Sequence, residues 1–328
     1  MKRIIFFTIA LALGLTACSG KGKEEPFVPG PGGDSTKVIE VKDCKKCMVL
    51  SEQSQHRIAI ADVESQQIIW EWKPEQSNVK KDHYNWFTNP SDAKPVYEGK
   101  YILATASGGG VALIRIADKK TIFYAFAGGN THSAELLPDG NIVSASSTGN
   151  FLTVFKTDST IAAEQAYSKN VTASFGHNVV WDAKRNLLWT AAMDKLVAFT
   201  YNNNCDAPAI SAVDTFNLPG TEAHDLFPIY GTDSLWLTNK TNVYKLDMTT
   251  KSWVQADAIQ KNIKSVSDGP AGFPVIIIRP KEEWWTDEVL DAQGKSIFKQ
   301  NGLRIYKARW LLDNMFSYPE AHPLKTCP

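Results

Sequence analysis

"GGNTHSAELLPDGNIVSASS" (residues 128–147) is one copy of a unit that recurs along the chain. In it, His132 precedes a short apolar run, a turn, and a second apolar run. His177 leads the same pattern before "NVVWDAKRNLLWTAA", and His224 leads it before "DLFPIYGTDSLWLTN". His83 opens the unit with a longer turn. Short runs in which apolar residues alternate, separated by turn residues, predict strands, so we expect an all-β chain.

The spacing of the unit indicates the architecture. The four histidines are 49, 45 and 47 residues apart, and a four-stranded propeller blade is roughly 40–50 residues long. The 272 residues from Val38 to Arg309 hold six such units. The sequence therefore predicts a six-bladed β-propeller with four-stranded antiparallel blades, and a seven-bladed ring is the alternative.

The ends of the repeat predict how the ring closes. The first blade is expected at residues 47–72, and the sixth from about Lys264 through "PVIIIRP" to "LRIYKARW". The N-terminal "KVIEV" (Lys37–Val41) is expected to add the outer strand of the sixth blade and so close the ring. This gives one propeller domain over residues 37–328.

Four cysteines follow Cys18, namely Cys44, Cys47, Cys205 and Cys327. The CxxC spacing of Cys44 and Cys47 also occurs in redox and zinc sites, but no second CxxC follows it. We expect a structural disulfide between one of these two and Cys327, because a cross-link between distant positions constrains the unfolded chain most. Cys205 has no obvious partner in the sequence.

The N-terminus predicts export and a lipid anchor. Two basic residues precede the apolar run Ile4–Leu15, which is shorter than the roughly 20 residues that span a bilayer. Residues 1–17 are therefore expected to be a signal peptide. The Leu-Thr-Ala-Cys that ends at Cys18 resembles the bacterial lipobox, which implies lipidation of Cys18; an ordinary signal peptide is the alternative. Residues 18–36 have the composition of a flexible tether.

The same tether bears on location and partners. Lys23-Glu24-Glu25 resembles the export signal of surface lipoproteins in Bacteroidota, so we expect an outer-membrane lipoprotein, either at the cell surface or facing the periplasm. Contact with the membrane is expected through the lipid on Cys18 alone. Lys+Arg and Asp+Glu both total 35, so no excess charge favours nucleic acid as a partner.

Three features together resemble a known family. They are the "DxxxxxxIW" phrase that ends at Trp70, the histidine-led strands, and the closing "KARW" at residues 307–310. These features are similar to those of uncharacterised β-propeller lipoproteins of Bacteroidota, which are distant relatives of quinoprotein-like and streptogramin-lyase-like propellers. The resemblance implies the fold and hardly any activity, and it does not imply the quinone cofactor.

The repeat predicts where the histidines lie. The inner strands of successive blades begin around one end of a central channel, so His83, His132, His177 and His224 are expected to converge there. Converging neutral imidazoles could bind one divalent metal ion. The pattern resembles metal-dependent pectate-type propeller lyases, in which such an ion grips a uronate. The alternative is that each histidine caps its own blade through backbone hydrogen bonds.

Aromatic residues add candidates for ligand binding. Tyr84 and Trp86 stand beside His83, and Trp284 and Trp285 lie in the sixth blade. In that blade the position that matches the histidines falls near Lys264 or Ser265, and Lys264 is a further candidate. Aromatic faces beside polar groups suit sugars, although tryptophans in blades usually pack between sheets.

Two classes of function follow. The first is a glycan-active enzyme, most simply a polysaccharide lyase, with His132, His177 and His224 as metal ligands or as acid and base. The second is a non-catalytic propeller that binds a glycan or a partner protein on the same face. A purely structural envelope protein is the third alternative. No GxSxG, Walker loop or HExxH motif is present to favour another chemistry.

Overall fold

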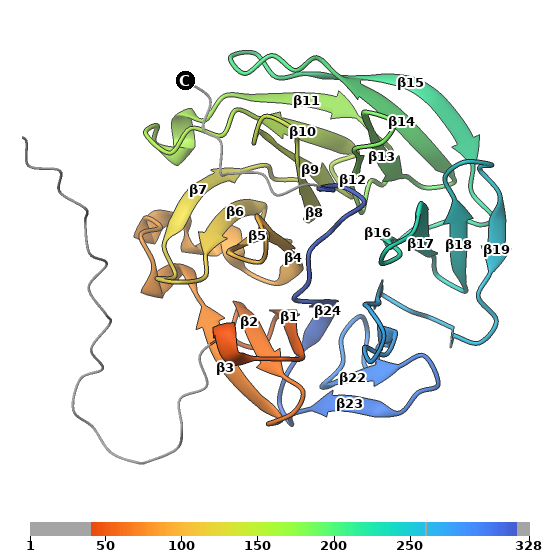
Figure 1. Ribbon diagram of the computed structural model, residues 1–328. Helices are drawn as coiled ribbons and strands as arrows, with labels where there is room; N and C mark the ends of the chain where they lie inside the picture. The colour runs from red at the N-terminus through yellow and green to blue at the C-terminus, as the bar shows by residue number, and fades with distance from the viewer. Residues whose placement is uncertain (1–40, 260, 320–328) are drawn as a thin grey trace, which may run out of the picture. The chain divides into compact units, whose positions relative to one another are not determined.

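The protein is described here from a computed structural model, which covers residues 41–259 and 261–319. Strands in these residues form six four-stranded sheets arranged in a ring (Figure 1). This confirms the predicted six-bladed β-propeller. The helices of the described part are four short 3-10 helices, η1 (Val41–Asp43), η2 (Pro74–Gln76), η3 (Lys81–Phe87) and η4 (Ala163–Gln165). None of the helices found in it is long and apolar enough to cross a membrane.

The first three blades contain the strands up to Thr172, together with the C-terminal strand β24 (Ile305–Trp310). Blade one has the order β24-β1-β2-β3, with β1 (Cys47–Glu52), β2 (Arg57–Asp62), β3 (Gln67–Trp72) and β24 (Ile305–Trp310). Blade two contains β4 (Pro90–Val96), β5 (Tyr101–Ala106), β6 (Gly110–Arg115) and β7 (Thr121–Phe126). Blade three contains β8 (Thr131–Leu136), β9 (Ile142–Ser146), β10 (Phe151–Phe155) and β11 (Ser168–Thr172).

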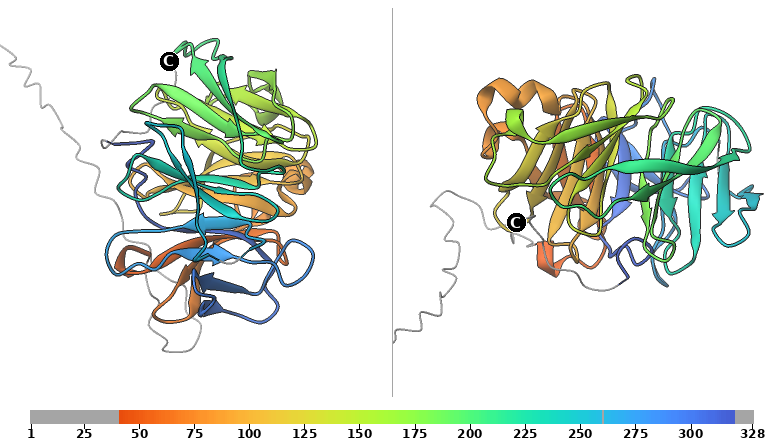
Figure 2. Two further views of the ribbon diagram at one scale, coloured as in Figure 1. Left: turned by 90° about the vertical axis from the view of Figure 1, so that its right-hand side faces the viewer. Right: turned by 90° about the horizontal axis from the view of Figure 1, so that it is seen from above.

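The remaining blades continue around the ring. Blade four contains β12 (Val180–Asp182), β13 (Leu187–Ala191), β14 (Lys195–Tyr201) and β15 (Ile210–Asn217). Blade five contains β16 (Asp225–Pro228), β17 (Ser234–Thr238), β18 (Val243–Asp247) and β19 (Trp253–Gln255). Blade six contains β20 (Ser265–Ser267), β21 (Ile276–Ile278), β22 (Glu288–Asp291) and β23 (Ser296–Lys299). In Figure 2 the ring is seen from two further sides, with the strands of each blade twisted against one another.

The hairpin of the repeated unit shows how the sequence makes these blades. Strands β8 and β9 pair antiparallel, and both are buried along their length. Between them the chain reverses at Gly140, which has a φ of 86° and donates its N–H to the Leu137 carbonyl at 2.9 Å. Glycine adopts that left-handed conformation without steric cost. The Asp-Gly turn of the sequence therefore sets the hairpin.

The ring closes differently from the prediction. Strand β24 pairs with β1 through Met48↔Trp310 to Glu52↔Ile305, so the C-terminal strand is the innermost strand of blade one. The "IYKARW" segment thus belongs to blade one and not to blade six. Blade six already has four strands of its own, whereas β1–β3 leave an open inner edge that β24 pairs and covers. Within Lys37–Val41, residues 37–40 lie outside the described residues, and Val41 begins η1.

The predicted disulfide is also corrected. Cys44 and Cys47 are bonded to each other, so neither can pair with Cys327, which lies outside the described residues. Cys205 is disulfide-bonded as well. The Cys44–Cys47 bond closes a loop at the start of β1, and it therefore acts locally and does not join the two ends of the propeller.

The core lies between neighbouring blades. One buried cluster joins blades one and two around Trp72 and Phe87, whose rings meet edge to face at 5.3 Å between centroids. Another joins blades four and five around Trp189. Both tryptophans are buried, as is expected for large aromatic side chains between packed sheets. Six of the ten tryptophans are buried in this way, which confirms that most of them serve packing; they are Trp70, Trp72, Trp181, Trp189, Trp236 and Trp310.

Buried charges fill the central channel. Arg309 and Lys307 project from β24, and they meet Asp225 from β16 and Asp92 from β4. Arg309 Nη1 donates to Asp225 Oδ2 at 2.7 Å, and Lys307 Nζ donates to Asp225 Oδ1 at 3.2 Å. Although burial alone would raise it, the pKa of Asp92 is held well below its usual range by Arg309 and Lys307. The cluster joins three blades across the channel, and removing one member would leave uncompensated buried charge.

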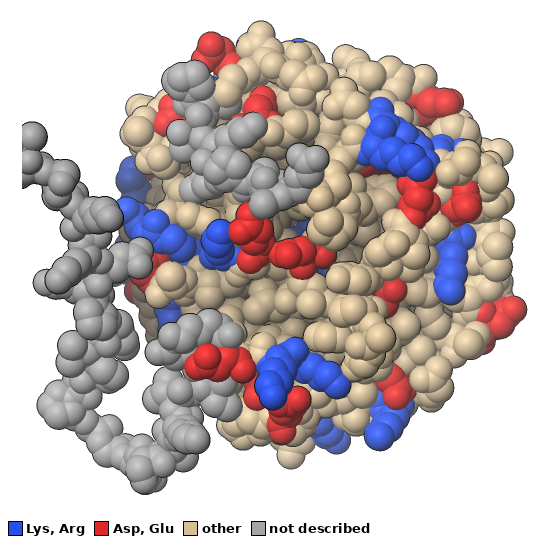
Figure 3. Space-filling view, in the orientation of Figure 1, with Lys and Arg blue, Asp and Glu red and all other residues tan. Residues whose placement is uncertain are grey.

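A short segment after β24 closes one end of this channel. Residues 311–318 run across the ring toward blade three (Figure 1), where the Leu136 backbone N–H donates to the Tyr318 hydroxyl at 3.1 Å. The Tyr318 hydroxyl also donates to Glu135. On this face the Lys, Arg, Asp and Glu side chains are mixed, as Figure 3 shows. We call the end of the channel that residues 311–318 cross the far end. We call the opposite end, where the inner strands begin, the channel mouth.

Candidate functional site

A backbone feature repeats at the channel mouth. Five residues with a φ between 53° and 61° stand just before the inner strands of blades two to six; they are Asn89, Asn130, Phe175, Glu222 and Asn262. Asparagine is among the residues that tolerate this left-handed conformation best. Two positions after each of these residues stands the equivalent residue of its blade; these are Ser91, His132, His177, His224 and Lys264. The repeat of the sequence is therefore a repeat of backbone geometry.

A bulge directs His132 into the mouth. The register between β8 and β9 shifts between Thr131 and Ser133, which leaves His132 outside the regular ladder. Such a bulge re-aims a side chain. The ring centroids of His132 and Tyr306, which belongs to β24, lie 5.6 Å apart.

Three of the predicted histidines converge. The ring centroids of His132 and His177 are 4.5 Å apart, and those of His177 and His224 are 5.3 Å apart. Lys264 continues the series, because its Nζ lies 3.1 Å from Nε2 of His224. Side chains of blades one and three to six thus meet around one end of the channel.

His83 does not join them, and the prediction of four converging histidines is wrong. It lies in η3, stacked on Trp86 at 3.7 Å between ring centroids. Its Nδ1 is 3.3 Å from the hydroxyl of Tyr124 on β7, and its Nε2 is 3.3 Å from Glu164 on η4. The long segment before β4 carries it to the outer strand of blade two. Tyr84 packs there as well, against the cluster between blades one and two.

In blade two the position equivalent to His132 belongs to Ser91, since the register shifts at both residues. "NPSDAK" (residues 89–94) aligns with "NTHSAE" (residues 130–135), so the shared asparagine could have identified it. The histidine spacing concealed this alignment, because 49 residues lie within the normal range of a blade.

Hydrogen bonds fix the tautomer of two of the rings. His132 Nδ1 lies 2.9 Å from the Asn130 carbonyl, and His177 Nδ1 lies 3.0 Å from the Phe175 carbonyl. A carbonyl can only accept, so the hydrogen is on Nδ1 and Nε2 keeps its lone pair. Burial, together with the positive charge of Lys307, lowers the pKa of His132 to about 3 and that of His177 to about 2. Both rings are therefore neutral near pH 7.

His224 and Lys264 form a different pair. Nδ1 of His224 is buried and has no hydrogen-bond partner within the described ranges. Burial lowers the pKa of His224 to about 2, and the neighbouring Lys264 contributes to this. Burial and the charge of Lys307 lower the pKa of Lys264 to about 8. Among the residues that the structure covers, no carboxylate forms an ion pair with Lys264.

A cavity of ≈ 300 Å³ adjoins the mouth. It is lined by Gln53, Asn89, Ser107, Asn130, His132, Trp284 and Tyr306. None of these described lining residues carries a carboxylate or a permanent positive charge. Except for His132 and Trp284, the sequence did not single them out, although Asn89 and Asn130 occupy the left-handed positions that recur in the repeat.

The neighbouring residues Trp284 and Trp285 have different surroundings, and only the first lines this cavity. Trp284 is 45% exposed and lines the cavity, while its indole Nε1 donates to Gln53 Oε1 at 3.0 Å. Trp285 instead lies under the guanidinium of Arg304, at 4.8 Å from its ring centroid. Of the predicted pair, only Trp284 offers an aromatic face to a ligand in the cavity.

The histidines do not form a compact metal site. In the described part of the chain, the one group of at least three ligand atoms within 4.8 Å of one another is Cys44, Cys47 and Asp62. The two sulfur atoms of that group are bonded to each other and are not thiolates, the form that binds metal. With His83 elsewhere in the fold, the four-histidine metal site is not assembled.

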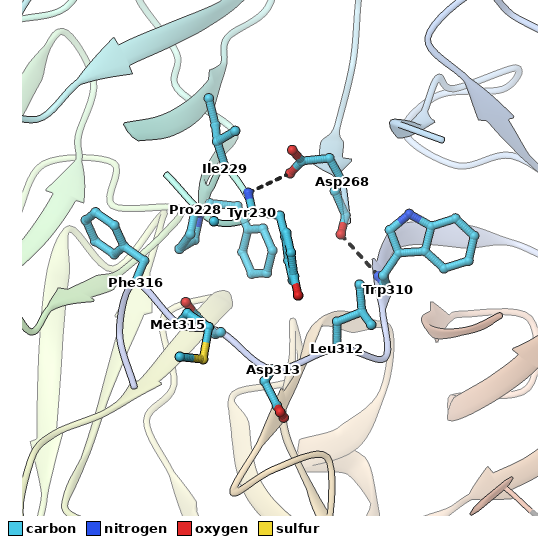
Figure 4. Close-up of a pocket in the computed structure, with 13 residues that line it drawn as sticks. Pro228, Ile229, Tyr230, Asp268, Trp310, Leu312, Asp313, Met315 and Phe316 are labelled. Carbon is cyan, nitrogen blue, oxygen red and sulfur yellow. Dashed lines mark hydrogen bonds between the residues drawn. The ribbon is translucent and has the colours of Figure 1, made fainter. Parts of the chain in front are cut away.

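A second pocket lies at the far end of the channel (Figure 4). Its volume is ≈ 30 Å³, which is about the room that one water molecule needs. Asp268 borders it and accepts from the Tyr230 backbone N–H at 3.2 Å and from Trp236 Nε1 at 3.1 Å. The cavity at the channel mouth has the larger volume of the two, and we therefore take it as the candidate site.

Comparison with known proteins gives a family and a fold. The model of a family described as "Family of unknown function (DUF6528)" matches residues 1–327. No curated protein matches the chain. A solved structure of a protein of unknown function from Bacteroides caccae is similar, with a TM-score of 0.55 and 14% identity over 81% of this chain and 98% of that one.

A second solved structure is the hydrazine synthase of Kuenenia stuttgartiensis, with a TM-score of 0.46 and 14% identity over 74% of each chain. At 14% identity the structure from Bacteroides caccae supports a likeness of fold alone. Activity has to be inferred from the residues at the mouth.

Proposed function

The chain belongs to the DUF6528 family of unknown function, and we propose that it binds an uncharged saccharide in the cavity at the channel mouth. The observation that carries this proposal is the lining of the cavity. An exposed tryptophan face stands beside amides, hydroxyls and a neutral imidazole, and no ionised side chain is among the described lining residues.

The chemistry of the lining matches that of a sugar. The C–H face of a pyranose packs on an aromatic ring, and its hydroxyls both donate and accept hydrogen bonds. Trp284 supplies the ring, and its contact with Gln53 holds it in place. Nε2 of His132 can accept from a sugar hydroxyl, because its Nδ1 donates to the backbone. The amides of Asn89 and Asn130 offer both donors and acceptors.

The volume of the cavity is consistent with a small unit of a glycan. At ≈ 300 Å³ it falls at the lower end of the range for small-molecule sites, roughly 300–1,000 Å³. It is also open, so a longer chain could continue from the bound unit into solvent.

Binding is favoured over lyase chemistry by the same lining. A lyase that acts on uronates must neutralise a carboxylate, and none of the described lining residues is cationic. Inverting or retaining hydrolysis needs two carboxyl groups, and the described lining has none. We therefore propose a binding propeller, and lyase activity becomes an outcome of the test.

Export and lipidation are part of the proposal. They rest on the apolar run Ile4–Leu15 and on Cys18, which lie outside the described residues. A lipid on Cys18 would hold the propeller at the outer membrane, where glycans of the surroundings are available. Metabolic labelling with palmitate tests this: the full-length chain should incorporate the label and the Cys18→Ala chain should not.

Neighbouring tryptophans provide a matched experiment for the site. A panel of neutral and acidic oligosaccharides is titrated against the wild type, Trp284→Ala and Trp285→Ala. Loss of a stacking ring costs about 1.4 kcal/mol or more, so Trp284→Ala should weaken binding of a neutral sugar about tenfold. Trp285→Ala should bind like the wild type.

Two results would contradict the proposal. One is equal binding by both variants, which would place the sugar elsewhere. The other is that no neutral saccharide binds; release of unsaturated product from a uronate polymer, seen by ultraviolet absorbance, would then assign the protein to the lyases.

A further inference from the structure

The pair of His224 and Lys264 has a contact pattern that needs a chemical explanation. Lys264 Nζ lies 3.1 Å from His224 Nε2, and the other nitrogen of that ring is buried without a partner among the described residues. A lysine ammonium usually meets carboxylates or carbonyls. Here its contact at hydrogen-bond distance is with a ring nitrogen.

Two arrangements of hydrogen satisfy this contact. If Lys264 is an ammonium, it donates to Nε2, and the histidine hydrogen is then on Nδ1, where a buried N–H has no acceptor. If Lys264 is a neutral amine, Nε2–H donates to the amine, and Nδ1 keeps only an unused lone pair. An orphaned buried N–H is the rarer and costlier defect, so the contact stabilises the neutral amine relative to the ammonium.

The charges around the amine act in the same direction. Burial lowers the pKa of Lys264 to about 8, and the positive charges of Lys307 and Lys240 oppose a further proton, whereas Glu222 favours one. The rings of His224 and His177 are neutral at pH 7 because burial lowers their pKa values to about 2. With a pKa of about 8, roughly a tenth of the Lys264 side chain is a neutral amine at pH 7, and this form is the nucleophile.

From this geometry we infer that Lys264 is a covalent capture site for aliphatic aldehydes. The amine lone pair leaves its hydrogen bond with Nε2–H of His224 and attacks the carbonyl carbon, and a C–N bond forms as the carbonyl π bond breaks. The oxygen takes up both amine hydrogens, with Nε2–H of His224 placed to relay a proton, and it leaves as water. One amine and one aldehyde give one imine and one water, so no oxidant or reductant is consumed. The inference uses a residue outside the sugar-binding cavity and does not depend on the proposed function.

Reductive trapping tests this inference. The full-length protein is treated with propionaldehyde and cyanoborohydride, which reduces an imine to a stable secondary amine, and the alkylated lysines are identified by peptide mass spectrometry. Lys261, which is exposed and lies three residues earlier, is the internal control. At pH 7 an amine with a pKa of about 8 has roughly 300 times the neutral fraction of an ordinary lysine. Its lower basicity offsets part of this gain, so we expect Lys264 to react about tenfold faster than Lys261.

Two variants test whether the contact between His224 and Lys264, and not merely the exposure of Lys264, sets its reaction rate. In His224→Gln the amide oxygen can accept from an ammonium, so the reaction of Lys264 should slow toward that of Lys261. In Lys264→Arg, labelling at this position should disappear while saccharide binding is retained. The rate at Lys264 should also level off above about pH 8.

The inference is overturned if Lys264 reacts no faster than Lys261, or if His224→Gln leaves its rate unchanged. Both outcomes are read without any saccharide, so failure here is distinct from failure of the proposed function.

Discussion

The neutral histidines of the channel mouth make the stability of the propeller depend on pH. His132 has a pKa of about 3 in the folded protein because it is buried, against 6.5 as its ordinary value. The unfolded chain therefore binds more protons than the folded one below pH 6.5. The contribution of the neutral His132 ring to the free energy of unfolding is fully present above pH 6.5, and it is lost as the pH falls toward 3.

The size of the effect follows from the two pKa values. At pH 5 an unfolded histidine is almost fully protonated and a folded one with a pKa near 3 is not, so protonation favours unfolding by about 2 kcal/mol per ring. His177 is equally buried and contributes a similar amount. Replacing one of them with glutamine removes its share of the pH dependence.

The free energy of unfolding is measured at pH 7.5 and at pH 5.0 by urea unfolding, which is monitored by tryptophan fluorescence. The loss of unfolding free energy between the two pH values should be smaller by about 2 kcal/mol in His132→Gln than in the wild type. An equal pH dependence in His132→Gln and the wild type would refute a buried, neutral His132.

Three other substitutions test the packing and the cross-links of the propeller by the same measurement of unfolding free energy. Asp225→Asn leaves Arg309 and Lys307 with one carboxylate fewer in the channel and should destabilise the protein by about 3–5 kcal/mol; a loss below about 1 kcal/mol would contradict a buried ionic cluster. Gly129→Ala should cost more than Gly99→Ala, because both have a φ above 60° but only the first would bring its new methyl group to 2.8 Å from a neighbouring Cα; equal losses would contradict the tight packing at Gly129. Cys44→Ser should cost about 2 kcal/mol, since its disulfide closes a very short loop; a loss near 4 kcal/mol would instead indicate a long-range cross-link.

Much of the fold was predictable because a repeat amplifies a weak local signal. One unit such as residues 128–147 could be any hairpin, but its recurrence every 45 to 49 residues defines blades. The closure was not predictable in the same way. Both KVIEV at residues 37–41 and IYKARW at residues 305–310 have the alternation of a strand, and only the open inner edge of β1 decides between them.

The site was predictable to the extent that the repeat placed its residues. His132, His177 and His224 occupy equivalent positions and meet as expected. His83 shares their spacing but not their position, because an additional 3-10 helix precedes β4. Local spacing cannot distinguish the two cases.

Contacts across the channel could not be predicted from the sequence. Asp92 and Asp225 are 133 residues apart in the chain, and they meet Arg309 because their blades face the channel from different sides. Gln53, Ser107 and Tyr306 line the cavity for the same reason. A single sequence holds no signal for pairs at such separation.

Nitrogen NMR of the histidine side chains, with and without a neutral saccharide from the panel, tests the central claim most directly. At pH 7 the His132 ring should carry its hydrogen on Nδ1, and the signal of its free Nε2 should move when a sugar hydroxyl donates to it. A protonated Nε2 in the free protein, or an Nε2 signal that is unchanged while the saccharide is bound, would contradict that claim.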